Sequence, residues 1–476
     1  MKVGVIGLGY VGLVTSACLA EWGHHVIGVD ASRNRLDALK RGRVPFFEPG
    51  LAEMVARHAS AGSLAFTSSS RDAVADADVV IVAVGTHDGN GGWQTETMLT
   101  CLSEVVPYMA DDAVLAVRST LPPDFIRQLP RLLRSIREQA GLEPIAAVVN
   151  PEFTREGAAI RDFLEAERVI FGVIDDGDGR GIARMSQLYE RSDAPVLTMP
   201  AIDAAFAKLG SNLFLATKIS FANELASLCD AYGAQVDHVI AGMAFDSRIG
   251  GRFLRAGVGF GGSCLPNQVT MTVKSASLAG VPSPLLAAVD DINHRQRTDF
   301  VARMRELIGG SLEGKRVALL GLTFKPMTDD LRDAPALDIA RHLISGGATV
   351  VAYDPMEGAR SRSADLVPGL EVVESALEAV ADADAVGLVT EWPEFINLDW
   401  AVVRAAVRNP VVVDGRAALS PDAMTALGFD YSAFGRGVWS GAPVEALAAR
   451  AASSVAGGLD SAGGGVLEAL SPISAE

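Results

Sequence analysis

Three short sequence patterns occur twice in this chain, in the same order, and they restrict its fold more than any other feature. Residues 2–10 (KVGVIGLGY) are echoed by 316–324 (RVALLGLTF), 23–30 (GHHVIGVD) by 347–354 (GATVVAYD), and 75–82 (ADADVVIV) by 381–389 (ADADAVGLV). Each is a short apolar run beside turn residues, which is typical of buried parallel strands. One echo alone would show only that such strands look alike. Three in order favour two doubly wound α/β domains.

A long helical segment lies between the two copies. From Ile202 to Leu228 the chain has no proline and a single glycine, Gly210, and apolar residues recur close to the helical period. A helix of this size is about 40 Å long at the usual rise per residue. Helices of such length often span a junction between domains and an interface between subunits.

We therefore expect an α/β protein with two doubly wound Rossmann-like domains, joined by a central helical domain with one long helix. The first domain is expected over residues 1–200, the central helical domain over 201–300 and the second α/β domain over 312–440. Residues 448–476 are rich in Ala, Gly and Ser, which predicts a tail with weak structural preference.

Charge and cysteine content exclude several classes of protein. The net charge of −17 argues against a nucleic-acid partner, which needs a basic face. No apolar run reaches the length of a membrane span, and the chain enters its first strand at once, without a signal peptide. The four cysteines form no C-x-x-C pair, so we expect no metal site or disulfide framework, and a cytoplasmic protein with reduced thiols.

The first copy contains a dinucleotide fingerprint. Residues 7–12 (GLGYVG) satisfy G-x-G-x-x-G between a predicted strand and a predicted helix, and Asp30 ends the next strand. Gly7, Gly9 and Gly12 would allow a tight turn and a close approach of the pyrophosphate to the helix start, while Asp30 would bind the adenosine ribose. A carboxylate there favours NAD over NADP. The alternative is a glycine-rich turn without a ligand.

One cysteine ends a loop that has few side chains. Residues 257–264 (GVGFGGSC) present Cys264 beside glycines, which let the backbone approach a ligand closely. A presented thiol together with a nicotinamide cofactor indicates oxidation through a covalent thiohemiacetal and thioester. The alternative is a buried, inert cysteine.

Four other stretches carry candidate groups for chemistry. Residues 150–157 (NPEFTREG) follow a predicted strand and contain two carboxylates four positions apart, and Lys208 and Asn212 lie on one side of the long helix. Thr120 and Arg416 each follow a predicted strand. The second copy lacks the glycine fingerprint, so we do not expect it to bind a dinucleotide; its Lys325 offers a cation for a different phosphate.

Together these motifs resemble the nucleotide-sugar 6-dehydrogenases of the UDP-glucose/GDP-mannose dehydrogenase family, over roughly residues 1–440. The resemblance is carried by residues 7–13 (GLGYVGL), 47–51 (FEPGL), 150–157 (NPEFTREG), 208–223 (KLGSNLFLATKISFAN), 257–266 (GVGFGGSCLP) and 321–325 (GLTFK). It implies that NAD oxidises the C6 alcohol of a nucleotide sugar to a carboxylate in two hydride transfers. Residues 150–153 resemble the glucose and mannose branches and residues 155–157 lean toward glucose, so UDP-glucose or a close relative is the expected substrate. The base is left open between uracil, thymine and guanine.

The resemblance assigns roles to five residues. Cys264 would be the nucleophile and Lys208 the acid/base or oxyanion-stabilising group. Asn212 would hydrogen-bond the same oxygen or a water, Glu152 would be the base for thioester hydrolysis, and Thr120 would position water. Each also has an ordinary structural interpretation: a surface lysine, a helix-face amide, a solvated carboxylate or a turn hydroxyl.

The resemblance also implies contacts with both ligands. The cofactor contacts would be Gly7, Gly9, Tyr10, Val11, Gly12, Asp30, Arg35, Thr86, Thr120, Glu156 and Arg332. The substrate contacts would be Phe153, Glu156, Lys208, Asn212, Arg248, Arg255, Gly261, Phe324, Lys325 and Arg416. Arg248 would reach the site from a neighbouring subunit, and we expect a homodimer formed through the central helix. For each arginine a surface ion pair is the alternative.

The chain departs from the family after its cysteine. Leu265-Pro266 is followed by Asn267 and Gln268, where the family usually has lysine and aspartate, and His87 follows Thr86 where the family has proline. An amide at 268 can neither act as a base nor offset the charge of Lys208. Three hypotheses follow: full oxidation to the uronic acid, a divergent enzyme that performs part of the reaction or takes an unusual sugar, and a nucleotide-sugar or NAD-binding protein without catalysis.

Overall fold

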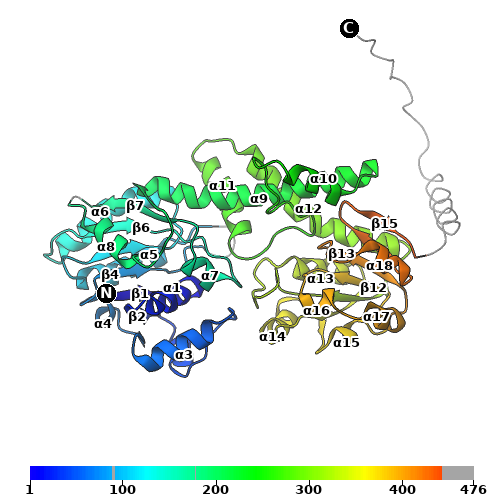
Figure 1. Cartoon of the computed structure of the whole chain (residues 1–476), viewed down its shortest axis with the longest axis horizontal. Coiled ribbons are helices and arrows are strands. Elements are labelled where there is room, and N and C mark those ends of the chain that lie inside the picture. The colour runs from blue at the N-terminus through cyan, green and yellow to red at the C-terminus, as the bar shows by residue number, and fades with distance from the viewer. Residues whose placement is uncertain (88–91, 177, 442–476) are drawn as a thin grey trace, which may run out of the picture.

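The structure is a computed structural model that describes residues 1–87, 92–176 and 178–441. Two α/β domains lie side by side, and a group of helices runs along one side of both (Figure 1). The chain therefore has the predicted fold class, two doubly wound sheets with a central helical region. The expected tail at 448–476 lies outside the described residues.

The first domain is built on an eight-stranded sheet with the order β3-β2-β1-β4-β5-β6-β7-β8. All neighbours are parallel except β6 and β7, and the first six strands have the doubly wound order. Its strands are β1 (Lys2–Ile6), β2 (His25–Val29), β3 (Leu64–Thr67), β4 (Val79–Val82), β5 (Val114–Val117), β6 (Ala146–Val149), β7 (Val169–Asp175) and β8 (Val196–Pro200). Its helices are α1 (Tyr10–Glu21), α2 (Arg33–Lys40), α3 (Leu51–Ala61), α4 (Ser70–Val74), α5 (Glu96–Val105), η1 (Val106–Tyr108), α6 (Pro123–Gln139), α7 (Ala159–Leu164) and α8 (Arg180–Leu188).

The second domain repeats this plan with a seven-stranded sheet ordered β11-β10-β9-β12-β13-β14-β15. Only the last pair is antiparallel. The strands are β9 (Arg316–Leu320), β10 (Thr349–Tyr353), β11 (Glu371–Val372), β12 (Ala385–Leu388), β13 (Val411–Asp414), β14 (Asp430–Ala433) and β15 (Gly437–Trp439). The helices are α13 (Pro335–Ser345), α14 (Glu357–Leu366), α15 (Ala376–Val380), α16 (Pro393–Ile396), α17 (Trp400–Ala406) and α18 (Pro421–Ala426).

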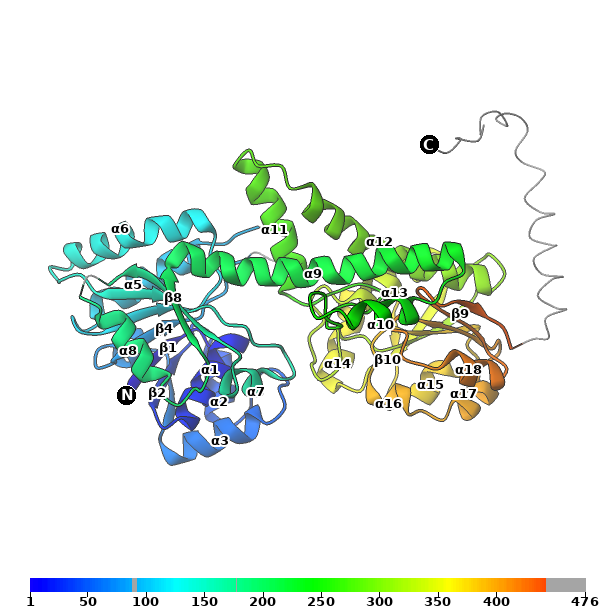
Figure 2. The same cartoon turned by 45° about the horizontal axis from the view of Figure 1, so that its top comes forward.

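Four helices connect the domains: α9 (Ala201–Tyr232), α10 (Val236–Ala244), α11 (Leu265–Leu278) and α12 (Pro284–Leu307). The helix α9 is longer than the predicted segment, because it starts directly after Pro200 and continues until Gly233 takes a left-handed conformation. It runs from the first domain to a position over the second, while α11 and α12 form a hairpin that rises away from it (Figure 2). Within the described residues, no helix is both long and apolar enough to cross a membrane.

Candidate active site

The fingerprint turn in the first domain leaves the start of α1 open. Gly7 has a φ of +93°, which favours glycine, and a Cβ on Gly12 would lie 1.8 Å from the Gly7 carbonyl oxygen. A Cβ on Gly9 would meet nothing within 4 Å, and no side chain caps the helix there. Tyr10 and Val11 begin the helix. The backbone N–H groups at this end are thus positioned to receive a pyrophosphate.

Asp30 closes the same turn. Its carboxylate accepts hydrogen bonds from the backbone of Leu8 at 2.9 Å and of Ser32 at 2.8 Å, and it pairs with Arg35 at 2.7 Å. Nearby, Thr86 donates its hydroxyl to the Thr120 carbonyl at 2.6 Å, which joins the ends of β4 and β5. An open helix start with a carboxylate at the end of β2 fits the predicted dinucleotide.

Side chains from several elements hold the backbone of the glycine loop before Cys264. Asn223 accepts a hydrogen bond from Gly257 N at 2.7 Å, and Asn293 accepts one from Phe260 N at 2.7 Å. Arg416 donates to the carbonyl of Gly259 at 3.0 Å and to that of Phe324 at 3.0 Å. Arg416 thus lies near the glycine loop, where a substrate contact was predicted. The two hydrogen bonds that it donates here go to backbone carbonyls of the protein.

The loop passes too close to the second domain for larger residues. A Cβ on Gly261 would lie 2.4 Å from the Asp333 carbonyl oxygen, and one on Gly262 would lie 2.9 Å from the Phe324 ring. Gly259 and Gly262 also have φ values of +88° and +81°. These glycines allow the loop to pack against the second domain and to end at Cys264.

Cys264 caps the N-terminus of α11 and is exposed, whereas Cys18, Cys101 and Cys229 are buried. Although solvent reaches the residue, protein surrounds it on most sides, and this desolvation raises the pKa of the Cys264 thiol. The charge of Glu152 raises the pKa further, and the Lys208 ammonium opposes it. The thiol is therefore presented, as the sequence predicted, between a cation and a carboxylate.

Lys208 and Glu152 form a buried ion pair beside that thiol, with Nζ and Oε1 3.2 Å apart. The second oxygen of Glu152 accepts hydrogen bonds from the Thr154 N–H at 2.7 Å and hydroxyl at 2.6 Å. Burial acts to raise the pKa of Glu152, but Lys208, Thr154 and Arg118 outweigh it and hold this pKa below its usual value. Phe153 lies under the Lys208 ammonium, 5.2 Å from Nζ to the ring centroid.

Asn212 follows Lys208 by one turn of α9, and both side chains are buried on the same face. The Asn212 amide donates to Gln268 Oε1 at 2.9 Å. Asn267, the other departure from the family, donates instead to the Ser263 carbonyl at 2.9 Å. Lys208 therefore keeps a carboxylate partner, Glu152, while the residue at 268 contacts Asn212.

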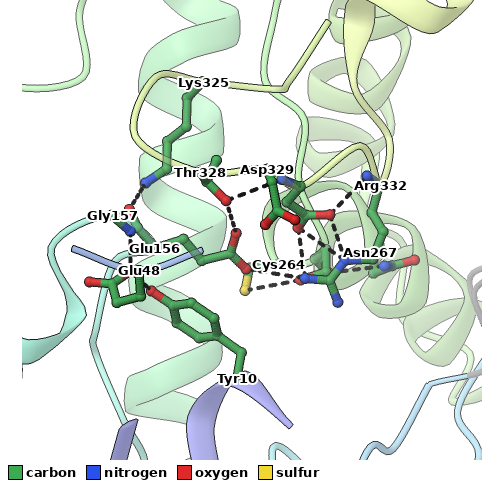
Figure 3. Close-up of polar contacts among 12 residues, drawn as sticks. Tyr10, Glu48, Glu156, Gly157, Cys264, Asn267, Lys325, Thr328, Asp329 and Arg332 are labelled. Atoms are coloured by element: carbon green, nitrogen blue, oxygen red, sulfur yellow. Dashed lines mark hydrogen bonds and ion pairs between the residues drawn. The ribbon is translucent and has the colours of Figure 1, made fainter. Parts of the chain in front are cut away.

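The carboxylate loop of the first domain also meets the loop 325–333 of the second. Glu156 pairs with Arg332 at 3.2 Å, and its other oxygen accepts from the Thr328 hydroxyl at 3.4 Å. In Figure 3 the Glu156 carboxylate points toward the Cys264 sulfur. Burial, followed by the charge of Asp330, raises the pKa of Glu156 to about 7, against the attraction of Arg332 and Lys325.

Lys325 donates its ammonium to the Glu156 backbone carbonyl. Burial lowers the pKa of Lys325, and the charge of Glu156 opposes this shift. The residue therefore lies at the seam between the domains, next to the carboxylate loop.

Glu48 has a position that the sequence did not indicate. Its buried carboxylate accepts hydrogen bonds from the Tyr10 hydroxyl, from Gly157 N at 2.6 Å and from Ala159 N at 2.7 Å (Figure 3). It therefore connects the start of α1 to the loop that carries Glu152 and Glu156. Its presence in the segment 47–51 was the one available signal, but nothing in that pattern names its partners.

Two predicted arginines lie away from the thiol. Arg255 lines a cavity of about 330 Å³, together with Asp237, Phe253, Leu254, Ala417 and Phe434. Arg248 is exposed and pairs with Asp246. Within one chain, Arg248 is therefore not brought to Lys208 or Cys264.

A doubly wound domain with an open dinucleotide turn, linked by helices to a second domain that meets it around a presented thiol, defines a dinucleotide-dependent dehydrogenase. Family models of the UDP-glucose/GDP-mannose dehydrogenase family match the chain in three parts: the NAD binding domain over residues 1–193, the central domain over 203–295 and the UDP binding domain over 318–421. The chain belongs to this family, and NAD is its dinucleotide.

Named relatives match almost the whole chain. The UDP-glucose 6-dehydrogenase of Rhizobium meliloti is 38% identical over 443 residues, covering 92% of this chain and 100% of the relative. That of Pseudomonas aeruginosa is 39% identical, covering 92% and 98%. The structure of a UDP-glucose dehydrogenase from Pyrobaculum islandicum superposes with a TM-score of 0.81 at 34% identity, covering 87% of this chain and 94% of that one.

Proposed function

We propose that this protein oxidises the C6 alcohol of a nucleotide sugar, UDP-glucose or a close relative, to the uronic acid in the cytoplasm. The observation that carries the proposal is the position of the Cys264 thiol beside the buried Lys208–Glu152 pair, at the seam of the two domains. Relatives that match 92% of the chain bear the name UDP-glucose 6-dehydrogenase, which supports this choice of sugar and base.

The residues present divide the chemistry as follows. NAD, when bound, supplies the acceptor for the two hydrides that leave C6. Lys208 stabilises the oxygen on C6 while it carries negative charge. The Cys264 thiolate forms a bond to the aldehyde carbon, and loss of the second hydride leaves a thioester. Water then adds, the carbon–sulfur bond breaks, and a carboxylate and a free thiol remain.

The direct test is to incubate the protein with NAD and a panel of UDP-, dTDP- and GDP-linked sugars and to measure NADH per sugar consumed. Two NADH for each UDP-glucose, with glucuronate as the product, are expected. One NADH per sugar would support the partial reaction instead. If no NADH forms with any sugar, the proposal is contradicted, and the hypothesis of a nucleotide-sugar or NAD-binding protein without catalysis remains.

We also propose that the protein acts as a homodimer through α9. Exposed apolar side chains recur along this helix at positions 206, 214, 221, 228 and 232, with exposed fractions from 47% to 86%. Positions 214, 221 and 228 are seven residues apart, and exposed apolar side chains at this spacing are the pattern of a helix packing against another. Phe221→Glu should convert the dimer to a monomer in analytical ultracentrifugation. A wild-type protein that sediments as a monomer would contradict this proposal.

A further inference from the structure

The residue one helical turn after Cys264 is Gln268, and it carries a hydrogen-bond donor that has no partner among the described residues. Gln268 is buried, and its backbone N–H bonds to the Cys264 carbonyl at 3.1 Å within α11. Residues four apart on a helix share a face, and their side chains lean toward its N-terminus. The Gln268 side chain is therefore directed along the same face as Cys264.

The two ends of the Gln268 amide are in different situations. Oε1 accepts the Asn212 amide at 2.9 Å, which fixes the orientation of both groups. Among the described residues, Nε2 has no hydrogen-bond partner, and it is not among the fully enclosed side-chain atoms that lack one. A buried side chain with an accessible, unpaired N–H₂ group is a donor available to a ligand.

The carboxylates that act on the thiol are already engaged. Glu152 is held by Lys208 and by both donors of Thr154, and Glu156 is held by Arg332 and Thr328. In contrast, Gln268 brings no charge to this face of α11. The set of groups around Cys264 therefore provides cations and amide donors for an oxyanion, but no free carboxylate at position 268 to accept a proton from water.

We propose that Gln268 donates a hydrogen bond from Nε2 to the oxygen on the sugar carbon bonded to Cys264, while its Oε1 positions Asn212. The two oxidation steps are then supported, and hydrolysis of the thioester, which needs a base to take a proton from water, is the slow step. This inference rests on the proposed function, since it concerns the intermediate that Cys264 forms. Both hydrides are transferred to NAD before water adds to the thioester. An enzyme that has accumulated as the thioester has therefore already formed two NADH per Cys264 thiol.

The experiment is a stopped-flow measurement of NADH after the protein is mixed with NAD and UDP-glucose, together with intact-mass analysis of acid-quenched samples. The wild-type protein should show a burst of two NADH per Cys264 followed by a slower steady state, with the acyl adduct visible by mass. Gln268→Ala should slow the burst by about a hundred-fold, the usual effect of losing one oxyanion donor, while NAD affinity stays unchanged.

Gln268→Asp exchanges the Nε2 donor for a carboxylate that can accept the Asn212 amide and activate water. It should slow the burst as Gln268→Ala does, but it should hydrolyse the thioester about ten-fold faster than the wild-type protein, so that the acyl adduct no longer accumulates. Asn267→Asp is the matched control: it adds the same charge one residue away, where the side chain bonds the Ser263 carbonyl, and should leave the ratio of burst to steady-state rate unchanged.

Three results would overturn the inference. They are a single phase without acyl adduct in the wild-type protein, an unchanged burst rate in Gln268→Ala, and an equal loss of the acyl adduct in Asn267→Asp and Gln268→Asp. If no NADH forms with any nucleotide sugar, the proposed function fails instead, so the two failures are distinguishable. The wild-type burst and the Gln268→Ala variant each test the inference by themselves. The inference can therefore be contradicted even if the Gln268→Asp variant folds poorly.

Discussion

The two doubly wound domains begin alike, down to individual hydrogen bonds. Gly7 and Gly321 have φ values of +93° and +94°, and each N–H bonds to the residue that ends the next strand, at 2.8 Å. The following backbone N–H bonds to Asp30 in one domain and to Asp354 in the other, at 2.9 and 2.8 Å. The same chain geometry therefore starts both turns.

The domains diverge directly after this point. In the first, Gly9 leads straight into α1 at Tyr10, and nothing lies within 4 Å of a Cβ built on Gly9. In the second, Thr323 donates both its N–H and its hydroxyl to Asp354, at 3.0 Å each, and the Trp392 indole also reaches this carboxylate at 3.3 Å. In the second domain the carboxylate that corresponds to Asp30 is therefore bonded by two side chains of the protein, those of Thr323 and Trp392.

The helix that would hold a pyrophosphate is displaced as well. The helix α13 begins at Pro335, and the intervening loop extends to the first domain, where Lys325 and Arg332 contact Glu156. A doubly wound sheet can therefore bind a dinucleotide at its turn, or fill the turn and use the connecting loop to build a neighbour's site. Thr323 stands in the second domain at the position of Gly9 in the first.

The largest effect is expected at the thiol, which belongs to neither sheet. Cys264→Ser should lower formation of the uronic acid by at least about a thousand-fold, because a hydroxyl is a far weaker nucleophile than a thiolate. NAD and UDP affinities, measured by calorimetry, should stay within about two-fold, since both domains are intact. Normal turnover in this variant would show that the covalent route is wrong.

A methyl group in the open turn should affect only the first domain. In Gly12→Ala the new Cβ would lie 1.8 Å from the Gly7 carbonyl oxygen, so the turn must shift. Displacements of this size lower binding by about a hundred-fold, which a fluorescence titration with NADH would measure. The control is Gly210→Ala on α9, where nothing lies within 4 Å of the new Cβ and NADH affinity should not change. Equal NADH affinity in Gly12→Ala would contradict our account of the turn.

The two equivalent aspartates should give opposite phenotypes. Asp354 is fully buried and accepts several hydrogen bonds, so Asp354→Ala should lower the free energy of unfolding by about 3 kcal/mol in a urea titration. Asp30→Ala should cost less stability, and should reduce the preference for NAD over NADP by about ten-fold in kcat/KM. A loss of cofactor preference in the Asp354 variant would break the distinction between the domains.

The smallest effect concerns pH at the seam between the domains. The pKa of Glu156 is raised from 4.5 to about 7, so the native protein holds this proton more tightly than the unfolded chain. This stabilisation is complete below pH 4.5 and is lost as the pH rises through about 7. Glu156→Gln should remove about 1–2 kcal/mol of that pH dependence, as measured by urea unfolding between pH 5 and 8. If the free energy of unfolding changes equally with pH in the wild-type protein and in Glu156→Gln, this prediction is contradicted.

Sequence reasoning identified the groups whose geometry is local. The duplicated strand patterns gave the two sheets, and helical spacing placed Lys208 and Asn212 on one face of α9. The glycines before Cys264 predicted a presented thiol, which the structure has. Each of these inferences depends on residues a few positions apart, where backbone periodicity alone fixes the relative directions of side chains.

The contacts that join distant segments could not be predicted from the sequence. Glu48 binds residues 109 and 111 positions further along the chain, and Asn212 meets Gln268 across 56 residues. Arg416 could be placed after its strand, but its use in pinning Gly259, 157 positions away, could not. A pattern in the sequence can name a carboxylate or an amide without saying which group it will face.

The amino-acid sequence by itself determined the two sheets, the cofactor turn and an exposed thiol at the end of a glycine loop, because periodicity and glycine conformations act within a few residues. Only the tertiary structure decided that Glu152 is the partner of Lys208, that Gln268 accepts the Asn212 amide, and that the loop of the second domain contacts Glu156 of the first. Those relations depend on how long helices pack between two sheets, and packing is a property of the whole chain.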